Sequence, residues 1–137
     1  MASLPWTAWV QGALLAPLAQ SGASAVLLMG ADGSMWGLAG QWNVSAQEAA
    51  TLANAIKTSA GAPISCTLGG VKFMGMRADD SEFVSNSTQK TCVCGHMLKK
   101  TTIVVWGALD HARNINAAVS KVAEALAQDP SVASLLN

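Results

Sequence analysis

Between Ile64 and Leu109 the chain alternates short apolar runs with still shorter polar or glycine-containing links. The runs are Ile64–Thr67, Lys72–Ala78, Phe83–Ser87, Cys92–Leu98 and Thr102–Leu109, and the links are Gly69–Gly70, Asp79–Asp80, Ser87–Lys90 and Lys99–Lys100. Runs of this length, bounded by turn residues, are typical of strands. Parallel neighbours would need a crossover of a dozen or more residues, so these links predict an antiparallel meander.

A helix and a hairpin are predicted before this meander. Trp6, Trp9, Val10, Ala13 and Leu14 recur at helical spacing, which predicts a helix from about Ser3, a suitable N-cap, to about Pro17. The apolar run Ala25–Met29, the turn Gly30–Gly33 and the run Ser34–Ala39 predict a hairpin, because the two glycines tolerate positive φ.

Two more helices complete the pattern. Ser45 and Glu48 have the spacing of a capping box, which predicts a helix to about Thr58. Asn114 is expected to open a closing helix that ends at Asp129–Pro130, with an apolar stripe of Ile115, Ala118, Val119, Val122 and Leu126. The fold class is therefore α+β: one domain with a central sheet whose faces helices cover.

Composition excludes several classes of function. Of the 137 residues, 51% are hydrophobic and only 12% are charged, which argues against a disordered chain and against a nucleic-acid surface. The formal net charge is zero, but all eight Lys and Arg residues fall in residues 57–137. A modestly basic second half fits an acidic protein partner or simply a solvated face.

Residues that could carry catalysis or a metal are few. Cys92, Cys94 and His96 alternate along one predicted strand, where core packing is favoured over a metal site because ligands on one strand converge poorly on one ion. His111 follows Asp110, but no activated Ser or Cys is identifiable beside it. We therefore expect no enzyme, no metal and no cofactor. Three cysteines cannot form a complete disulfide framework, so a reducing compartment is expected.

Aromatic residues are concentrated near the start of the chain. There are five Trp and no Tyr, and Trp6 and Trp9 lie one helical turn apart. A core cluster under the first helix is one interpretation. Exposed indoles also suit a polyproline II helix, whose rings pack on flat aromatic faces and whose carbonyls accept indole hydrogen bonds.

Several of these features occur together in one family. Trp6, Trp9, the string Asp32-Gly33-Ser34-Met35-Trp36, the string Leu68-Gly69-Gly70-Val71-Lys72-Phe73 and Arg77 have the order and spacing of profilins, which the chain resembles from about Trp6 to about Leu126. The resemblance implies N- and C-terminal helices on one face of the sheet and a shorter helix on the other. It also implies a monomeric, cytoplasmic protein of the cytoskeleton, with one domain over 1–137 and a C-terminal extension at 130–137.

The resemblance further implies partners and sites. Profilins bind monomeric actin, speed its nucleotide exchange and deliver it to filament barbed ends. The matching residues here are Lys72, Arg77, Lys90, His111, Arg113, Asn116 and Lys121. Proline-rich proteins such as formins would bind at Trp6, Trp9 and Trp36, in a groove weakened because Ala125 stands where the family commonly has an aromatic residue or His. Phosphoinositide lipids would bind Lys72, Lys90, Lys99 and Lys100.

Two other classes of function remain open from the residues alone. A small sensory or trafficking α+β domain with a ligand pocket or a dimer partner would share this layout. An enzyme would need to use His111 together with the Cys92, Cys94 and His96 strand. Binding to monomeric actin separates the first interpretation from both of these.

Overall fold

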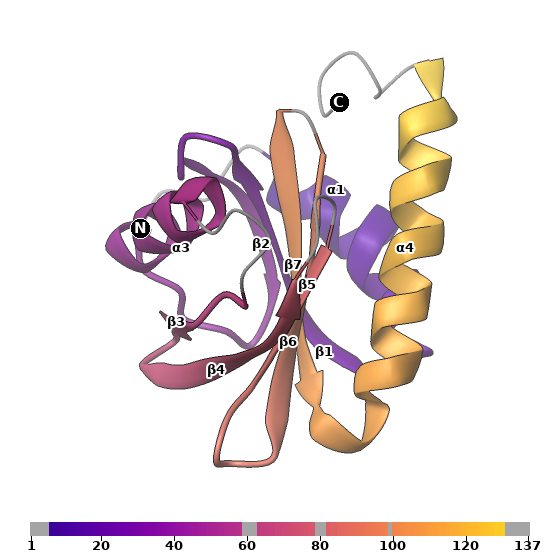
Figure 1. The fold of residues 1–137 in the computed structure, drawn as a ribbon. Helices are drawn as coiled ribbons and strands as arrows, with labels where there is room; N and C mark the ends of the chain where they lie inside the picture. The colour runs from indigo at the N-terminus through magenta and orange to yellow at the C-terminus, as the bar shows by residue number, and fades with distance from the viewer. Residues whose placement is uncertain (1–5, 59–62, 79–81, 99, 131–137) are drawn as a thin grey trace.

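The computed structural model describes residues 6–58, 63–78, 82–98 and 100–130. In these residues seven strands form one antiparallel sheet (Figure 1), in the order β2-β1-β7-β6-β5-β4-β3. The strands are β1 (Ala23–Gly30), β2 (Met35–Gly40), β3 (Cys66–Leu68), β4 (Val71–Ala78), β5 (Glu82–Asn86), β6 (Thr91–Met97) and β7 (Thr101–Ala108). The predicted hairpin and meander are confirmed, with strand bounds in the meander that differ from the prediction by at most two residues.

Helices cover both faces of the sheet. They are α1 (Thr7–Trp9), the π-helical turn η1 (Val10–Leu15), α2 (Ala16–Ala19), α3 (Ala46–Thr58), the 3-10 turn η2 (Leu109–His111) and α4 (Ala112–Gln128). Figure 1 shows α1 and α4 on one side of the sheet and α3 on the other. This confirms the predicted arrangement. No helix in the described ranges is long and apolar enough to cross a membrane.

Alternation along the central strands divides the core into two layers. Val26 and Leu28 of β1 pack with Val10 of η1 and with Ile115 and Val119 of α4. Ala25, Leu27 and Met29 of β1 pack in the other layer, beneath α3, with Leu52, Phe73 and Phe83. Because successive side chains of a strand point to opposite faces, a strand covered on both faces must be apolar throughout. The run Ala25–Met29 in β1 is apolar at every position because both of its faces are covered.

The first helix runs further than predicted. It passes through Pro17 and ends at Ala19, followed by Gly22 at φ 104°; the expected N-cap Ser3 lies outside the described residues. The prediction ended the helix at Pro17 because a proline ring clashes with the carbonyl of the preceding turn. Here the preceding turn is π-helical, with the Ala16 N–H bonded to the Gln11 carbonyl. The wider turn accommodates the ring, so the helix continues.

The closing helix begins two residues before its predicted start. Turn η2 leads directly into α4, and the Ala112 N–H bonds to the Leu109 carbonyl, so Asn114 is not the cap. The predicted stripe is confirmed: Ile115 and Val119 are buried and Ala118, Val122 and Leu126 are partly buried against the same core. Asp129 takes the extended conformation expected before a proline.

The predicted capping box also holds a distant turn in place. The Ser45 N–H donates to Glu48 Oε1 at 2.9 Å and the Glu48 N–H donates to Ser45 Oγ at 3.1 Å. The same carboxylate accepts from the N–H groups of Gly69 and Gly70, both at 3.0 Å. These glycines have φ of 61° and 78°, in the left-handed region that glycine adopts readily. Glu48 therefore joins the start of α3 to the β3–β4 turn.

Candidate protein-binding surfaces

Three indoles meet where the first helix lies on β2. Trp6 and Trp9 are edge-to-face with ring centroids 5.3 Å apart, and Trp6 lies 5.6 Å from Trp36 at an interplanar angle of 38°. All three are half-buried and pack against the core layer beneath α4. We call them the tryptophan cluster. Each indole is thus part of the core and also part of the surface, so neither interpretation from the sequence excludes the other.

Backbone contacts between the helix and the strand fix the geometry of this cluster. The Trp6 N–H donates to the Trp36 carbonyl at 2.9 Å, and the Leu38 N–H donates to Thr7 Oγ1 at 3.3 Å. Gly37 allows this approach, since a Cβ there would lie 2.8 Å from the carbonyl carbon of Trp6 and 2.7 Å from Val10 Cγ2. Glycine is needed here because another backbone comes so close.

The indole N–H groups differ in their availability. Trp36 Nε1 donates to Ser34 Oγ at 3.1 Å, and the Ser34 hydroxyl donates to Asp32 Oδ1 at 2.6 Å. The side-chain and backbone hydrogen bonds from Ser34 lower the pKa of Asp32, so this carboxylate keeps its charge. Within the described ranges, the indole N–H groups of Trp6 and Trp9 make no hydrogen bond. They can therefore donate to a bound carbonyl.

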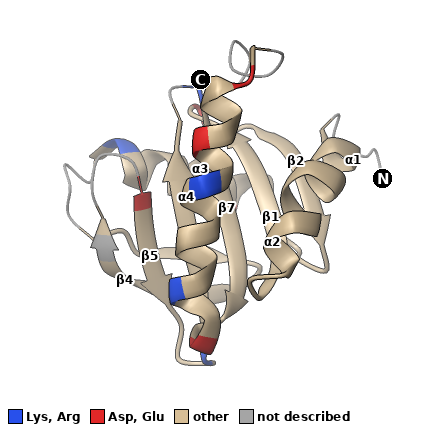
Figure 2. Cartoon of the chain, turned by 90° about the vertical axis from the view of Figure 1, so that its right-hand side faces the viewer, with Lys and Arg blue, Asp and Glu red and all other residues tan. Residues whose placement is uncertain are grey.

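The flank of α4 toward α2 continues from this region. Asn114, Ala118 and Lys121 line a hollow of about 340 Å³ with Gln20 and Ser21 at the end of the first helix. Ala125 is exposed one turn after Lys121, on the same flank by helical periodicity. Figure 2 shows α1 and α2 beside α4 across this face. Residues 131–137 of the expected extension lie outside the described residues.

The opposite flank of α4 borders a second surface. Ala112, Arg113 and Asn116 line a hollow of about 420 Å³ together with Val84 of β5; we call it the α4–β5 hollow. Further along this flank, Ser120 Oγ donates to Glu82 Oε2 at 2.8 Å. Figure 2 shows that charged positions on this face are sparse and that several lie along α4.

Strand β4 adds an apolar strip to the second surface. Met74 pairs with Asn86, and a register shift between Gly75 and Arg77 makes Met76 the extra residue of a bulge beside Val84. Met74 and Met76 are 52% and 58% exposed, and they are the large hydrophobic side chains most open to solvent in the described ranges. An isolated exposed apolar side chain is ordinary, but two beside a hollow mark a candidate interaction surface.

The structure separates the residues predicted to bind actin. Arg113 and Asn116 lie together in the α4–β5 hollow. Lys90 and His111 lie near the start of α4, where the Leu109 N–H donates to the Lys90 carbonyl and His111 packs against Gly22. Lys121 lies on the other flank of α4. The backbone of Arg77 pairs with Val84, but its side chain is outside the described part.

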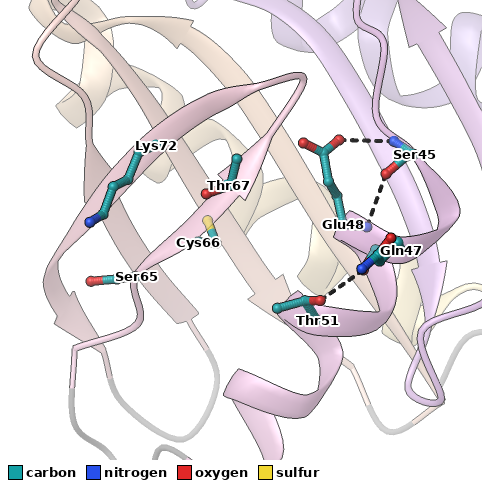
Figure 3. Close-up of a pocket in the computed structure, with 8 residues that line it drawn as sticks. All are labelled: Ser45, Gln47, Glu48, Thr51, Ser65, Cys66, Thr67 and Lys72. Carbon is teal, nitrogen blue, oxygen red and sulfur yellow. Dashed lines mark hydrogen bonds between the residues drawn. The ribbon is translucent and has the colours of Figure 1, made fainter.

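Lys72 belongs to a third hollow, formed by α3 and β3. Figure 3 shows it with the other lining residues, Ser45, Gln47, Glu48, Thr51, Ser65, Cys66 and Thr67. The volume is about 380 Å³. Lys72 therefore does not lie with Arg113 and Asn116. The sequence analysis did not identify Met74, Met76 or Val84 as surface residues. One signal was available: Met74 and Met76 lie one and three residues after Phe73, so strand alternation places them on the face opposite that buried side chain.

The lysines predicted to bind phosphoinositides do not form one cluster. Lys90 lies in the β5–β6 turn and Lys100 in the β6–β7 turn, so β6 (Thr91–Met97) separates them. At about 3.3 Å per residue, this strand separates Lys90 and Lys100 by more than the width of one lipid headgroup. Lys72 lies on β4, and Lys99 lies outside the described residues.

Of the candidate catalytic groups, Cys92 and Cys94 are parts of the core, His96 is half-buried and His111 is exposed. Cys92 and Cys94 are fully buried beneath α4, with Sγ atoms 3.6 Å and 3.7 Å from the carbonyls of Ala108 and Ala112. His96 Nδ1 lies 3.8 Å from Glu82 Oε2. Burial, and then the charge of Glu48, raises the pKa of Cys66 to about 12. Cys66 therefore stays a protonated thiol and a poor nucleophile at neutral pH.

The fold and its surfaces define a small α+β protein with an aromatic surface on one flank of α4 and an apolar surface on the other. A sequence model of the profilin family matches residues 4–130. A profilin of Naegleria pringsheimi is 41% identical over 106 residues, which cover 74% of this chain and 77% of that protein. The chain belongs to the profilin family.

Solved structures agree with this assignment. Profilin IB of Acanthamoeba castellanii superposes with a TM-score of 0.74 at 22% identity, covering 88% of this chain and 95% of that chain. LokiProfilin1 in its complex with rabbit actin superposes with a TM-score of 0.67 at 15% identity, covering 88% of this chain and 98% of that chain. These likenesses show the same fold, with its seven-stranded sheet between the two layers of helices.

Proposed function

We propose that this protein binds monomeric actin and regulates its polymerisation. The observation that carries the proposal is the family match over residues 4–130. A second support is that LokiProfilin1, which has the same fold, is found in a complex with actin. In this proposal the protein acts as a binding module. We propose this function in place of the two alternatives, a sensory or trafficking domain and an enzyme. It acts in the cytoplasm, where it accelerates nucleotide exchange on actin and delivers monomers to filament barbed ends.

The surface that we assign to actin is formed by β4, β5 and the adjoining flank of α4. Its centre is apolar, with Met74, Met76 and Val84, and Arg113 lies at its edge. Interfaces commonly place apolar anchors at the centre and charges at the rim, where the charges set the encounter rate and the specificity. The basic residues of the second half of the chain are consistent with an acidic partner.

Charge reversal at Arg113 tests this assignment. Arg113→Glu should weaken binding to monomeric actin at least tenfold, about 1.4 kcal/mol, because it opposes the charge of an acidic partner at the edge of the hollow. Lys57→Glu is the matched control, since Lys57 is an exposed cation near the end of α3 on the other face of the sheet. Titration of fluorescently labelled actin gives both dissociation constants. Equal affinities for the two variants would place the actin surface elsewhere.

We assign proline-rich ligands to the tryptophan cluster and the adjoining flank of α4. Trp6 and Trp9 offer indole faces and N–H donors to a polyproline II helix. Ala125 lies on the same flank as Ala118 and Lys121 and supplies no ring. The ligand is therefore held by aromatic residues from one side only, which makes the affinity low for this kind of groove.

Polyproline titration followed by tryptophan fluorescence tests the second assignment. The wild type should give a weak saturable change, and Ala125→Tyr should tighten binding because it adds a ring on the flank that faces the first helix. Ala127→Tyr is the matched control, because residue 127 lies on the opposite flank of α4. A wild type with no response, together with an unresponsive Ala125→Tyr variant, would leave the chain without a proline site.

Phosphoinositide binding stays a prediction from the resemblance to the family. The separation of Lys90 from Lys100 by strand β6 means that one headgroup cannot use both residues. A headgroup site would have to form at one end of the strand alone.

A further inference from the structure

We propose that Met74 and Met76 form an oxidation-sensitive site that controls binding at the α4–β5 surface. Peroxide converts both side chains to methionine sulfoxide, and the modified protein loses affinity for its partner. The inference rests on the proposed function, because it names a regulation of the same surface. The selectivity of the oxidation can be tested without actin.

Exposure sets these two methionines apart from the others in the described residues. Met74 and Met76 are 52% and 58% exposed, whereas Met29 has no exposed surface. Met35 and Met97 are half-buried and pack against the core layer beneath α3. A thioether reacts when an oxidant can reach its sulfur, so oxidation should begin on β4.

The chemistry requires only a peroxide. The thioether sulfur attacks one oxygen of the peroxide, a new S–O bond forms and the O–O bond breaks. The sulfur loses two electrons, and the peroxide is reduced to water or, for an organic peroxide, to an alcohol. A methionine sulfoxide reductase reverses the modification. The oxidation of Met74 and Met76 is therefore a reversible modification rather than permanent damage.

The position of the two residues makes the modification consequential. Met74 lies opposite Asn86, and Met76 is the extra residue of the bulge beside Val84, which lines the α4–β5 hollow. Thioether side chains fit varied apolar partners because they are flexible and polarizable. A sulfoxide places a strong hydrogen-bond acceptor in the same position, and burying that group without a donor is unfavourable. The modified strip should therefore pack poorly against a partner.

The first measurement is peptide mass spectrometry after limited treatment with hydrogen peroxide. With each methionine resolved by fragmentation of its peptide, Met74 and Met76 should gain oxygen at least roughly tenfold faster than Met29, because the Met29 side chain has no exposed surface. Equal oxidation rates for Met29 and the two β4 methionines would overturn the proposed site.

The second measurement compares actin affinity before and after peroxide treatment. The wild type should lose at least tenfold in affinity and regain it after incubation with methionine sulfoxide reductases. The double variant Met74→Leu, Met76→Leu should bind actin with the same affinity before and after peroxide treatment, whether or not the substitutions themselves change that affinity. The matched control Met35→Leu, Met97→Leu keeps both β4 methionines and should lose affinity on oxidation as the wild type does.

The outcomes separate this inference from the proposed function. Untreated protein that fails to bind actin refutes the proposed function and, with it, control of that binding, while the mass spectra still decide whether the site is selectively oxidised. Untreated protein that binds actin equally well before and after complete oxidation of Met74 and Met76 refutes the inference and leaves the proposed function intact.

Discussion

Gly37→Ala should destabilise the fold by about 2–3 kcal/mol, because the first helix packs directly on the backbone of β2 and leaves no space for a methyl group. The added Cβ would lie 2.8 Å from the carbonyl carbon of Trp6, 2.9 Å from its carbonyl oxygen and 2.7 Å from Val10 Cγ2. Two of these atoms are backbone and cannot rotate away. The first helix must move off β2, which also separates Trp6 from Trp36 and should weaken polyproline binding. Urea unfolding followed by circular dichroism measures the loss.

The same substitution at Gly12 is the control. A Cβ at Gly12 would meet no heavy atom within 4 Å in the described residues beyond the adjacent residues and the backbone of its own helix, and the residue lies in the π-helical turn of the first helix. Gly12→Ala should leave stability unchanged or raise it by about 0.5–1 kcal/mol, because alanine loses less backbone entropy on folding. Equal stability of the two variants would mean that Trp6 does not press on β2 as described.

Glu48→Gln should cost about 1.5–3 kcal/mol at neutral pH, the range for hydrogen bonds to a charged group. The carboxylate accepts from the N–H groups of Ser45, Gly69 and Gly70. An amide offers only one acceptor oxygen and turns its NH₂ group toward a backbone donor, so at least one of these bonds is lost. Glu124→Gln, at an exposed position on α4, is the matched control and should change stability by less than about 0.5 kcal/mol.

The effect of Glu48→Gln should also depend on pH. Burial raises the pKa of Glu48, but the hydrogen bonds from Ser45, Gly70 and Gly69 outweigh it and hold the pKa below its ordinary value of 4.5. A carboxylate whose pKa is lower in the folded state stabilises the fold above its unfolded pKa and loses that effect as the pH falls through the lowered value. The two proteins should therefore differ fully at pH 7 and converge in acid. A difference that stays constant down to pH 3 would contradict this account.

Much of the fold could be predicted from local sequence. The short links between Ile64 and Leu109 leave antiparallel pairing as the only connection that fits, and Ser45 and Glu48 mark the start of α3 because both members of a capping box lie within one turn. The stripe that includes Ile115 and Val119 identifies the buried face of α4 in the same way. These features are set by residues close together in the chain.

Features that depend on distant contacts could not be predicted in this way. Pro17 ends a regular helix, and only the π-helical turn before it lets the helix continue. Which flank of α4 meets β5 and which meets α2 is set by tertiary packing, so Arg113 and Lys121 fall on different surfaces although both are basic. The bulge at Met76 is likewise invisible in the period-two pattern of β4.

The order of strands in the sheet also determines how the chain can fold. Strand β1 pairs with β7, the last strand in chain order, so that Gly30 at the end of β1 lies opposite Thr101 at the start of β7. This pairing closes a long loop that contains β2, α3 and the four earlier strands of the meander, β3 to β6. The entropy of loop closure must be lost before those contacts form, so such topologies fold more slowly than helical bundles of equal size. During synthesis the β1–β7 pair cannot form until β7 has left the ribosome, and until then β1 has only β2 as its neighbour in the sheet.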